Sequence, residues 1–401
     1  MASQRELNGS DETAHYGASG ASSPAWDTRT TRLCLEATEL ELMPDSAILT
    51  QSLSLKSVIL TTSSFNRQFQ SACAYSELQK FNQIGSGLQG AVFEVVGQVL
   101  ASKKENPGNE TLSSNLRREF AIHRDVSAAF DQYKHATHSQ VHVPKPHEFI
   151  SKTQHHTFWD EDFPKMPPAY RTRADVVKMD RILPLPKVVR KALISHSYGR
   201  DKHLDATDIE TLLNEPKNKH CLARVYLGQT TGPMNLDTLA PLRNFPLYLG
   251  FMEELGIDTI ALANEMGKTY AILHWGAGVN GDDVEFVLGT STIEAPKAVV
   301  EPPDFQHRAV GLYLLDFGQC EAVDLTQDCD VIYQAFKGAM VTGDNQRFIP
   351  HYSRSPGLFE AFKNGYMDGG NAILLQKQLS DKFSMVDFMQ EYEEYAEDFL
   401  Q

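Results

Sequence analysis

The chain has 401 residues, of which 41% are hydrophobic and 9% aromatic, so it can bury the core of one large domain or of two smaller ones. Its formal net charge of -15 opposes non-specific binding to nucleic acid and to anionic membrane surfaces. Scattered cysteines without a Cys-x-x-Cys pair, and the lack of a long apolar run, argue against a zinc finger and a membrane span, and we expect a cytoplasmic or nuclear protein.

The first part of the chain is predicted to change from disorder to helix to strand. Residues 1–32 are rich in Ser, Ala, Gly and Thr and predict a disordered leader. Residues 33–79 carry apolar side chains with few turn signals, and they predict a helical extension that braces the following domain. Two apolar runs, in FNQIGS and AVFEVVGQVLASKK, then predict strands with a hairpin around Gly97 and Gln98.

One helix and several short strands are expected next. A helical pattern begins near Ser113 in SSNLRREFAIHRDVSAAFDQY, where apolar residues lie partly on one face. The segments VHVPKPHEFI, ADVVKMDRILPLP and LARVYLG each predict a short strand.

The remainder of the chain is predicted to be mostly helical. Its clearest helix spans residues 257–273, with Asp258 as a possible cap. The apolar segments VEFVL and VGLYLLDF follow, separated by a proline-containing insertion at residues 289–308. Strands first and helices later indicate an α+β protein with two lobes, at residues 80–182 and 183–401.

A glycine-rich stretch opens the strand region. Gly85, Gly87 and Gly90 with Val92 spell G-x-G-x-x-G-x-V, which on its own is a weak signal because hairpins often contain glycine. A dinucleotide-binding fold would need a helix directly after the third glycine. An extended run follows instead, which favours a strand-loop-strand flap that covers phosphates with backbone N–H groups.

Such a flap requires a lysine on the next strand and a glutamate on the following helix. Lys103 stands in an Ala-x-Lys sequence and would contact phosphates, while strand alternation predicts that Lys104 faces outward. Glu119 lies 16 residues after Lys103 and would hold the lysine in place. The alternatives are a solvated lysine leaving a hairpin and an exposed glutamate on a helix.

The most informative stretch is AILHWGAGVNGDDVEFVLG, a long helix followed by a polar loop and an apolar strand. This is the layout of a kinase catalytic loop, and aligning VEFVL with its strand puts Glu285 at the metal-binding position and Asn280 at the position of the catalytic aspartate. Asn280 can hydrogen-bond but cannot accept a proton from a hydroxyl group at neutral pH. Asp282 or Asp283 could substitute as the base, or both could belong to a solvated acidic turn.

The last expected site residues are an acidic metal ligand and a hinge. Asp316 begins an Asp-Phe-Gly sequence directly after an apolar strand and would bind Mg²⁺ that bridges the phosphates. In the kinase-like arrangement that these motifs resemble, the stretch MDRILPLP, which begins at Met179, would be the hinge where the adenine of ATP pairs with backbone groups.

Taken in order, these motifs resemble the protein-kinase-like fold, and they span residues 85–318. A more specific resemblance lies in His274, Trp275, Ala277 and Gly278 followed by DVEFVL, which is similar to a poorly characterised fungal domain catalogued as zinc-finger-protein-associated. The resemblance implies a bilobal α+β fold with a small sheet-containing N-lobe with one helix and a larger, mostly helical C-lobe. Members of that domain usually carry an acid at the position of Asn280, so this chain departs from them there.

Two functions of different classes follow from the motifs. One is an ATP- and Mg²⁺-dependent phosphotransferase that acts on a protein or a small-molecule acceptor. The other is a pseudokinase that acts through protein contacts, with or without bound nucleotide, and Asn280 favours it because the catalytic base is replaced.

Overall fold

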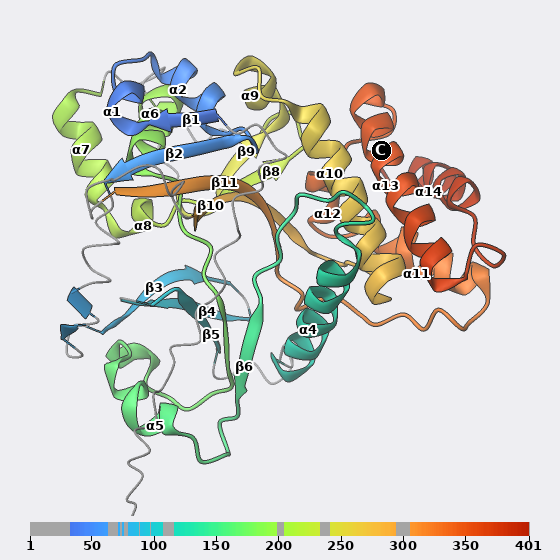
Figure 1. Ribbon diagram of the computed structural model, residues 1–401, viewed down its shortest axis with the longest axis horizontal. Helices are drawn as coiled ribbons and strands as arrows, with labels where there is room; N and C mark the ends of the chain where they lie inside the picture. Colours follow the sequence, from blue (N-terminus) through green and yellow to red (C-terminus); the bar gives the residue numbers. More distant parts are fainter. Residues whose placement is uncertain are drawn as a thin grey trace, which may run out of the picture.

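The computed structural model describes residues 33–62, 71–72, 74–75, 79–87, 89–96, 98–106, 116–198, 204–232, 241–293 and 305–400. The predicted leader and Gly97 of the predicted hairpin lie outside these ranges. The described residues form an α+β fold with two separate β-sheets, which occupy different halves of the molecule (Figure 1).

The smaller sheet has five strands, in the order β3-β4-β5-β7-β6, and every neighbouring pair is antiparallel. Its strands are β3 (Phe81–Ser86), β4 (Gly90–Val95), β5 (Leu100–Glu105), β6 (Pro146–Ile150) and β7 (Val176–Asp180). Helix α4 (Leu116–Tyr133) connects β5 to β6, and the short helix α5 (Thr157–Glu161) lies between β6 and β7. The predicted strands and helix of this region are confirmed.

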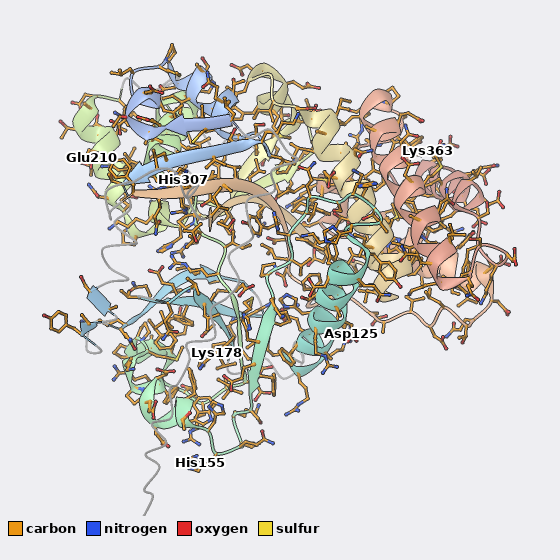
Figure 2. All side chains as sticks on the ribbon, viewed as in Figure 1. Asp125, His155, Lys178, Glu210, His307 and Lys363 are labelled. Carbon is orange, nitrogen blue, oxygen red and sulfur yellow. The ribbon has the colours of Figure 1, made fainter. Side chains whose placement is uncertain are left out.

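One face of the five-stranded sheet is covered by α5 and the turns beside it. Phe93 on this face is fully buried and contacts Tyr170 edge to face. Lys178, labelled in Figure 2, lies over the ring of Phe158. Lys104 projects to the same face, because it pairs with Ala91 and Val176 across the sheet. The prediction that Lys104 faces outward is therefore wrong: the side chain alternates as expected, but its face is covered and the residue is only 1% exposed.

The larger sheet has six strands, in the order β1-β2-β11-β10-β8-β9. Its strands are β1 (Leu33–Glu36), β2 (Ser57–Thr62), β8 (Ala223–Tyr226), β9 (Phe245–Tyr248), β10 (Glu285–Ile293) and β11 (Phe305–Leu315). The outer pairs β1–β2 and β8–β9 are parallel, and the inner pairs are antiparallel.

This sheet corrects one sequence prediction and extends another. The segment 33–79 is not a purely helical extension, because β1 and β2 join the edge of β11. The segment 183–401 is mostly helical as expected, and its predicted strands are β8, β10 and β11, with β10 and β11 extending into the predicted insertion at residues 289–308. The pairing partner of β2 lies more than 240 residues away, so no local pattern could reveal it.

The helices surround the six-stranded sheet at both ends (Figure 1). Beside β1 and β2 lie α1 (Ala37–Leu40), α2 (Asp45–Ser52), α6 (Lys187–Tyr198), α7 (Ala206–Asn214) and α8 (Pro216–Lys219). The remaining helices are α9 (Leu249–Glu254), α10 (Thr259–Ala271), α11 (Cys329–Met340), α12 (Asn345–Phe348), α13 (Pro356–Lys377) and α14 (Met385–Phe399).

Helix α10 confirms the strongest helix prediction. Asp258 caps it by accepting a hydrogen bond from the backbone N–H of Ala261. The helix continues into a π-helical turn, Ile272–Ala277, which leads directly into the polar loop of the candidate site.

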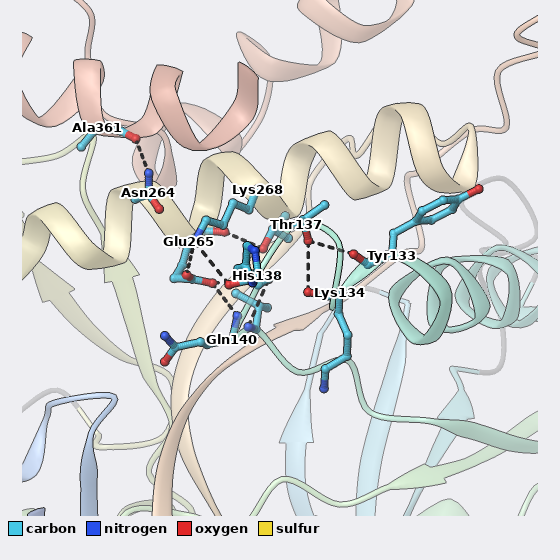
Figure 3. Close-up of polar contacts among 12 residues, drawn as sticks. Tyr133, Lys134, Thr137, His138, Gln140, Asn264, Glu265, Lys268 and Ala361 are labelled. Atoms are coloured by element: carbon cyan, nitrogen blue, oxygen red, sulfur yellow. Dashed lines mark hydrogen bonds and ion pairs between the residues drawn. The ribbon is translucent and has the colours of Figure 1, made fainter. Parts of the chain in front are cut away.

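A buried carboxylate fixes the segment after α4 against α10 (Figure 3). Glu265 accepts hydrogen bonds from the backbone N–H of Gln140 at 2.6 Å and from Ser139 at 3.3 Å, and it pairs with Lys268 at 2.9 Å. The bonds from Ser139 and Gln140 tie the segment that follows α4 to α10, and they restrict where α4 stands relative to the second half of the molecule. Within the ranges described, no helix has the length and apolar character needed to cross a bilayer.

Candidate functional site

Lys103 lies at the centre of the candidate site. It stands on β5, the middle strand of the five-stranded sheet, and its ammonium group is 2.6 Å from Oε1 of Glu119 on α4. The same Nζ atom is 3.2 Å from Oδ1 of Asp316, which directly follows β11 of the other sheet. The structure thus brings together three predicted site residues from segments that are up to 213 positions apart.

The environment of Lys103 keeps its ammonium group charged. The side chains of Lys103 and Glu119 are 10% and 7% exposed, so the pair is shielded from water. Burial lowers the pKa of Lys103, but the carboxylates of Asp316 and Glu119 outweigh it and raise the pKa above its usual value. Lys103 is therefore an ammonium cation held between two carboxylates.

The glycine turn lies next to this ion pair. Gly87 donates its backbone N–H to Gly90 at 2.9 Å, which closes the turn between β3 and β4. A Cβ atom at Gly90 would lie 2.5 Å from the carbonyl oxygen of Lys104, so only glycine fits there. Gly85 and Val92 are cross-strand partners in β3 and β4, which places all four predicted residues of the motif around one tight turn.

A residue that the sequence interpretation missed projects from this turn. The side-chain amide of Gln89 lies 3.4 Å from Nζ of Lys103, and it packs directly against Gly318 of the Asp-Phe-Gly sequence. Asn106 stabilises the turn by donating to the carbonyl oxygens of Gln89 at 3.1 Å and Gly87 at 3.0 Å. The G-x-G-x-x-G pattern gave no signal for Gln89, since any residue can occupy that position.

Asp316 has a left-handed backbone conformation, with φ of 66°. The following residue, Phe317, is buried and packs against the ring of His123 on α4, with ring centroids 4.7 Å apart. Arg118 of the same helix donates to the carbonyl oxygen of Cys320 at 2.7 Å. These contacts hold the Asp-Phe-Gly segment against α4, so the position of Asp316 depends on the helix that also carries Glu119.

The side chain of Asn280 is hydrogen-bonded to backbone groups. Its Oδ1 accepts hydrogen bonds from the backbone N–H groups of Glu321 at 2.8 Å and of Asp282 at 3.2 Å. The Asn280 carbonyl oxygen lies 3.1 Å from Nε2 of His274. The amide therefore links the polar loop to the segment after the Asp-Phe-Gly sequence.

Asp282 and Asp283 have different surroundings. Asp282 accepts a hydrogen bond from the hydroxyl of Thr342 at 3.1 Å, and burial raises its pKa. Asp283 has φ of 57° and accepts a hydrogen bond from the backbone N–H of Asp344. Burial and the neighbouring carboxylates of Asp344 and Asp316 raise the pKa of Asp283. Asp344 is a site residue that the sequence did not reveal, because it comes from a separate turn before α12.

Glu285 does not present a free carboxylate. Its Oε1 lies 2.5 Å from Nη2 of Arg224 on β8, the strand that pairs with β10. Burial, together with the nearby carboxylate of Asp316, raises the pKa of Glu285 to about 7, although Arg224 opposes the shift. Arg224 was not predicted, since its role depends on the pairing of β8 with β10.

The acidic residues do not fit a preformed magnesium site. Glu285 is neutralised by Arg224, and Asp316 shares its carboxylate with Lys103. Over the part of the chain that the structure describes, no three Asp, Glu, His or Cys side chains come together as metal ligands would.

The predicted hinge connects the two sheets. Met179 lies in β7, opposite Ala101 of β5, and the chain then runs along β10. Leu183 exchanges backbone hydrogen bonds with Thr290 at 2.8 and 3.0 Å, and the N–H of Leu185 is bonded to the carbonyl oxygen of Cys221. Several hinge backbone groups are therefore already used within the protein.

An ion pair lies on the Lys103 face of the five-stranded sheet, at the end next to the predicted hinge. Glu94 of β4 lies opposite Ala101, on the face that carries Lys103, and forms a salt bridge with Arg181. Asn82 of β3 donates to Glu94 at 3.0 Å, and His220 from the other half of the molecule lies 3.9 Å from it. Polar contacts between the two halves thus exist at the hinge end as well as at Lys103.

A comparison with protein-family models gave no match, and a comparison with curated protein sequences gave none at the significance required.

Proposed function

We propose that this chain is a kinase-like protein that binds the phosphates of ATP at Lys103. The observation that carries the proposal is the contact of Lys103 with both Glu119 and Asp316, at 2.6 and 3.2 Å. In protein kinases a lysine of the third strand pairs with a glutamate of the following helix, and both function together with the aspartate of an Asp-Phe-Gly sequence. Lys103 stands on the third strand of its sheet in chain order, and Glu119 on the next helix.

The two-sheet architecture is compatible with a bilobal kinase-like fold. The glycine turn joins the first two strands of the smaller sheet, and Gln89 of this turn contacts Lys103. The hinge leads from this sheet to the second half, which supplies Asp316 and the polar loop. In this proposal the six-stranded sheet, with its added strands β1 and β2, extends the second lobe of the kinase-like fold.

Binding is better supported than phosphoryl transfer. Transfer would use Asp282 or Asp283 as base, because the Asn280 amide cannot accept a proton and its oxygen is already bonded to backbone N–H groups. A Mg²⁺ site made of Asp316 and Glu285 does not fit the geometry while Arg224 pairs with Glu285, so no step is assigned to the metal here. A regulatory protein that acts on other proteins through its nucleotide-bound form is the second candidate, and Asn280 favours it.

The test is a thermal-shift and calorimetric titration with ATP, with and without Mg²⁺. Wild type is expected to be stabilised by ATP, by about 2.7 kcal/mol at a hundredfold excess over Kd. Lys103→Ala should lose this stabilisation, whereas Lys178→Ala, a lysine on the opposite face of the same sheet, should keep it. Asp316→Asn serves as a second variant, since its side chain is 38% exposed and its loss should not prevent folding.

The result separates the candidate functions. No stabilisation of wild type by ATP in either condition would contradict nucleotide binding. Stabilisation accompanied by ATP consumption would identify a phosphotransferase, and stabilisation without consumption, also with added protein acceptors, favours the regulatory role.

A further inference from the structure

Lys103 has no hydrogen-bond donor left for a ligand. A lysine ammonium group has three N–H donors. In this protein its three acceptors are Glu119 at 2.6 Å, Asp316 at 3.2 Å and the amide oxygen of Gln89 at 3.4 Å. A phosphate oxygen that binds Lys103 directly therefore competes with these three acceptors.

Gln89 is the acceptor that is easiest to displace. It is neutral, whereas Glu119 and Asp316 are carboxylates whose attraction to Lys103 is much stronger. Its contact is also the longest of the three. Glu119 stands on an 18-residue helix and Asp316 directly follows a strand, so both belong to or adjoin regular structure. Gln89 instead belongs to the tight, glycine-containing turn between β3 and β4.

The surroundings of Gln89 indicate where the ligand would lie. Its side chain fills the space between Lys103 of one sheet and Gly318 of the other half of the molecule, where a Cβ atom on Gly318 would collide with it. The backbone of Gln89 is anchored by Asn106, so the side chain can move without the turn opening. A carbonyl oxygen that accepts from Lys103 in this space occupies the place of a phosphate oxygen.

We propose that Gln89 is a placeholder in the phosphate site: its amide oxygen binds Lys103 until the triphosphate chain of a ligand displaces it. This inference rests on the function proposed above and adds a residue that sets the affinity of the site. On this proposal Gln89 loses its bond to Lys103 when the ligand binds, so we expect removal of the Gln89 side chain to favour the ligand.

The experiment measures the affinity for ATP and for inorganic triphosphate by calorimetry in wild type, Gln89→Ala and Gln89→Glu. Gln89→Ala should bind both probes about two- to tenfold more tightly, the factor expected for loss of one weak hydrogen bond. Gln89→Glu should bind them at least about tenfold more weakly, because a third carboxylate beside Lys103 repels phosphate. Gln83→Ala is the matched control: Gln83 bonds to Gly85 in the same turn region at 3.4 Å, and its loss should leave the affinity unchanged.

Each outcome decides a different point. Equal or weaker binding by Gln89→Ala, with ATP still bound by wild type, would overturn the placeholder and leave the proposed function intact. Triphosphate binding that Gln89→Ala strengthens, with no ATP binding by any variant, would support the placeholder and contradict a nucleotide ligand. Absence of binding of either probe to wild type and to Gln89→Ala would overturn both. Melting temperatures without ligand verify that each variant is folded.

Discussion

At the scale of the residue, Lys103 shows how a buried charge is made tolerable. Moving an ammonium group out of water costs several kcal/mol of free energy, and only close, well-oriented carboxylates in the protein interior compensate for this cost. Glu119 is buried with it, while Asp316 remains partly exposed. The pair therefore depends strongly on Glu119, and the lysine would be left with one screened partner if Glu119 were neutral.

This dependence gives a stability prediction for Glu119→Gln. The substitution keeps the shape of the side chain but removes the charge, and we expect the free energy of unfolding to fall by about 3 kcal/mol, as for other broken buried pairs. Urea unfolding of wild type and variant measures this. The double variant Lys103→Met with Glu119→Leu should recover most of the loss, since well-packed apolar residues can replace a buried ion pair.

The control for this prediction is an exposed ion pair. Glu210 of α7 (Figure 2) pairs at 2.7 Å with Lys187 of α6, and both side chains are more than half exposed. Glu210→Gln should leave the urea midpoint unchanged, because water already solvates both charges. A fall in stability as large as that of Glu119→Gln would contradict the assigned role of burial.

At the scale of the element, the contact between α10 and α13 depends on glycine. A Cβ atom at Gly267 of α10 would collide with the backbone of Phe362, and one at Gly365 of α13 would collide with the carbonyl oxygen of Asn264. Asn264 also donates to Ala361 across the same interface at 3.2 Å (Figure 3). The two helices lie so close that their backbones touch, and this fixes the start of the polar loop that follows α10.

Gly365→Ala is therefore expected to destabilise the protein although alanine is the better helix former. The intrinsic gain is about 1 kcal/mol, and the cost of forcing the helices apart is about 1–3 kcal/mol or more. Gly338→Ala in α11 is the matched control, since a Cβ there meets only the end of Gln334 at 3.8 Å. Thermal denaturation should show a lower Tm for Gly365→Ala and an equal or higher Tm for Gly338→Ala; the reverse order would refute the close contact.

At the scale of the whole molecule, buried histidines link stability to pH. His274 has no exposed surface, and burial lowers its pKa to about 3, while the pKa of the buried His123 is lowered to about 4. Both are neutral in the folded protein below the pKa of about 6.5 that applies to the unfolded chain. The unfolded state therefore takes up protons that the folded state does not, and stability is lost as the pH falls below about 6.5.

We expect His274→Gln to reduce this pH dependence. Between pH 6.5 and 5 one such histidine contributes a loss of about 2 kcal/mol in the free energy of unfolding. Glu285 acts in the opposite sense, because its pKa is raised to about 7 and its contribution is lost as the pH rises through that range. Urea unfolding at pH 7 and at pH 5 gives the loss in the free energy of unfolding between the two pH values for each protein. An equal loss in wild type and in His274→Gln would contradict the neutral state of His274.

The sequence by itself determined the local features of this protein. The strands of the smaller sheet, the helix that carries Glu119 and the cap of α10 follow from periodicity and capping, which act over a few residues. The order of the glycine turn, Lys103, Glu119 and Asp316 also stood in the sequence, and these residues indeed lie together.

Only the tertiary structure decided the contacts that change the chemistry of these groups. The pairing of Glu285 with Arg224, the backbone bonds of Asn280, the burial of Lys104 and the contact of Gln89 with Lys103 all depend on which segments meet in space. The strands β1 and β2 illustrate the same point, since they complete a sheet whose other strands begin more than 150 residues later. Local patterns carry no information on such pairings, because the energy that selects them comes from burying surfaces that are distant in the chain.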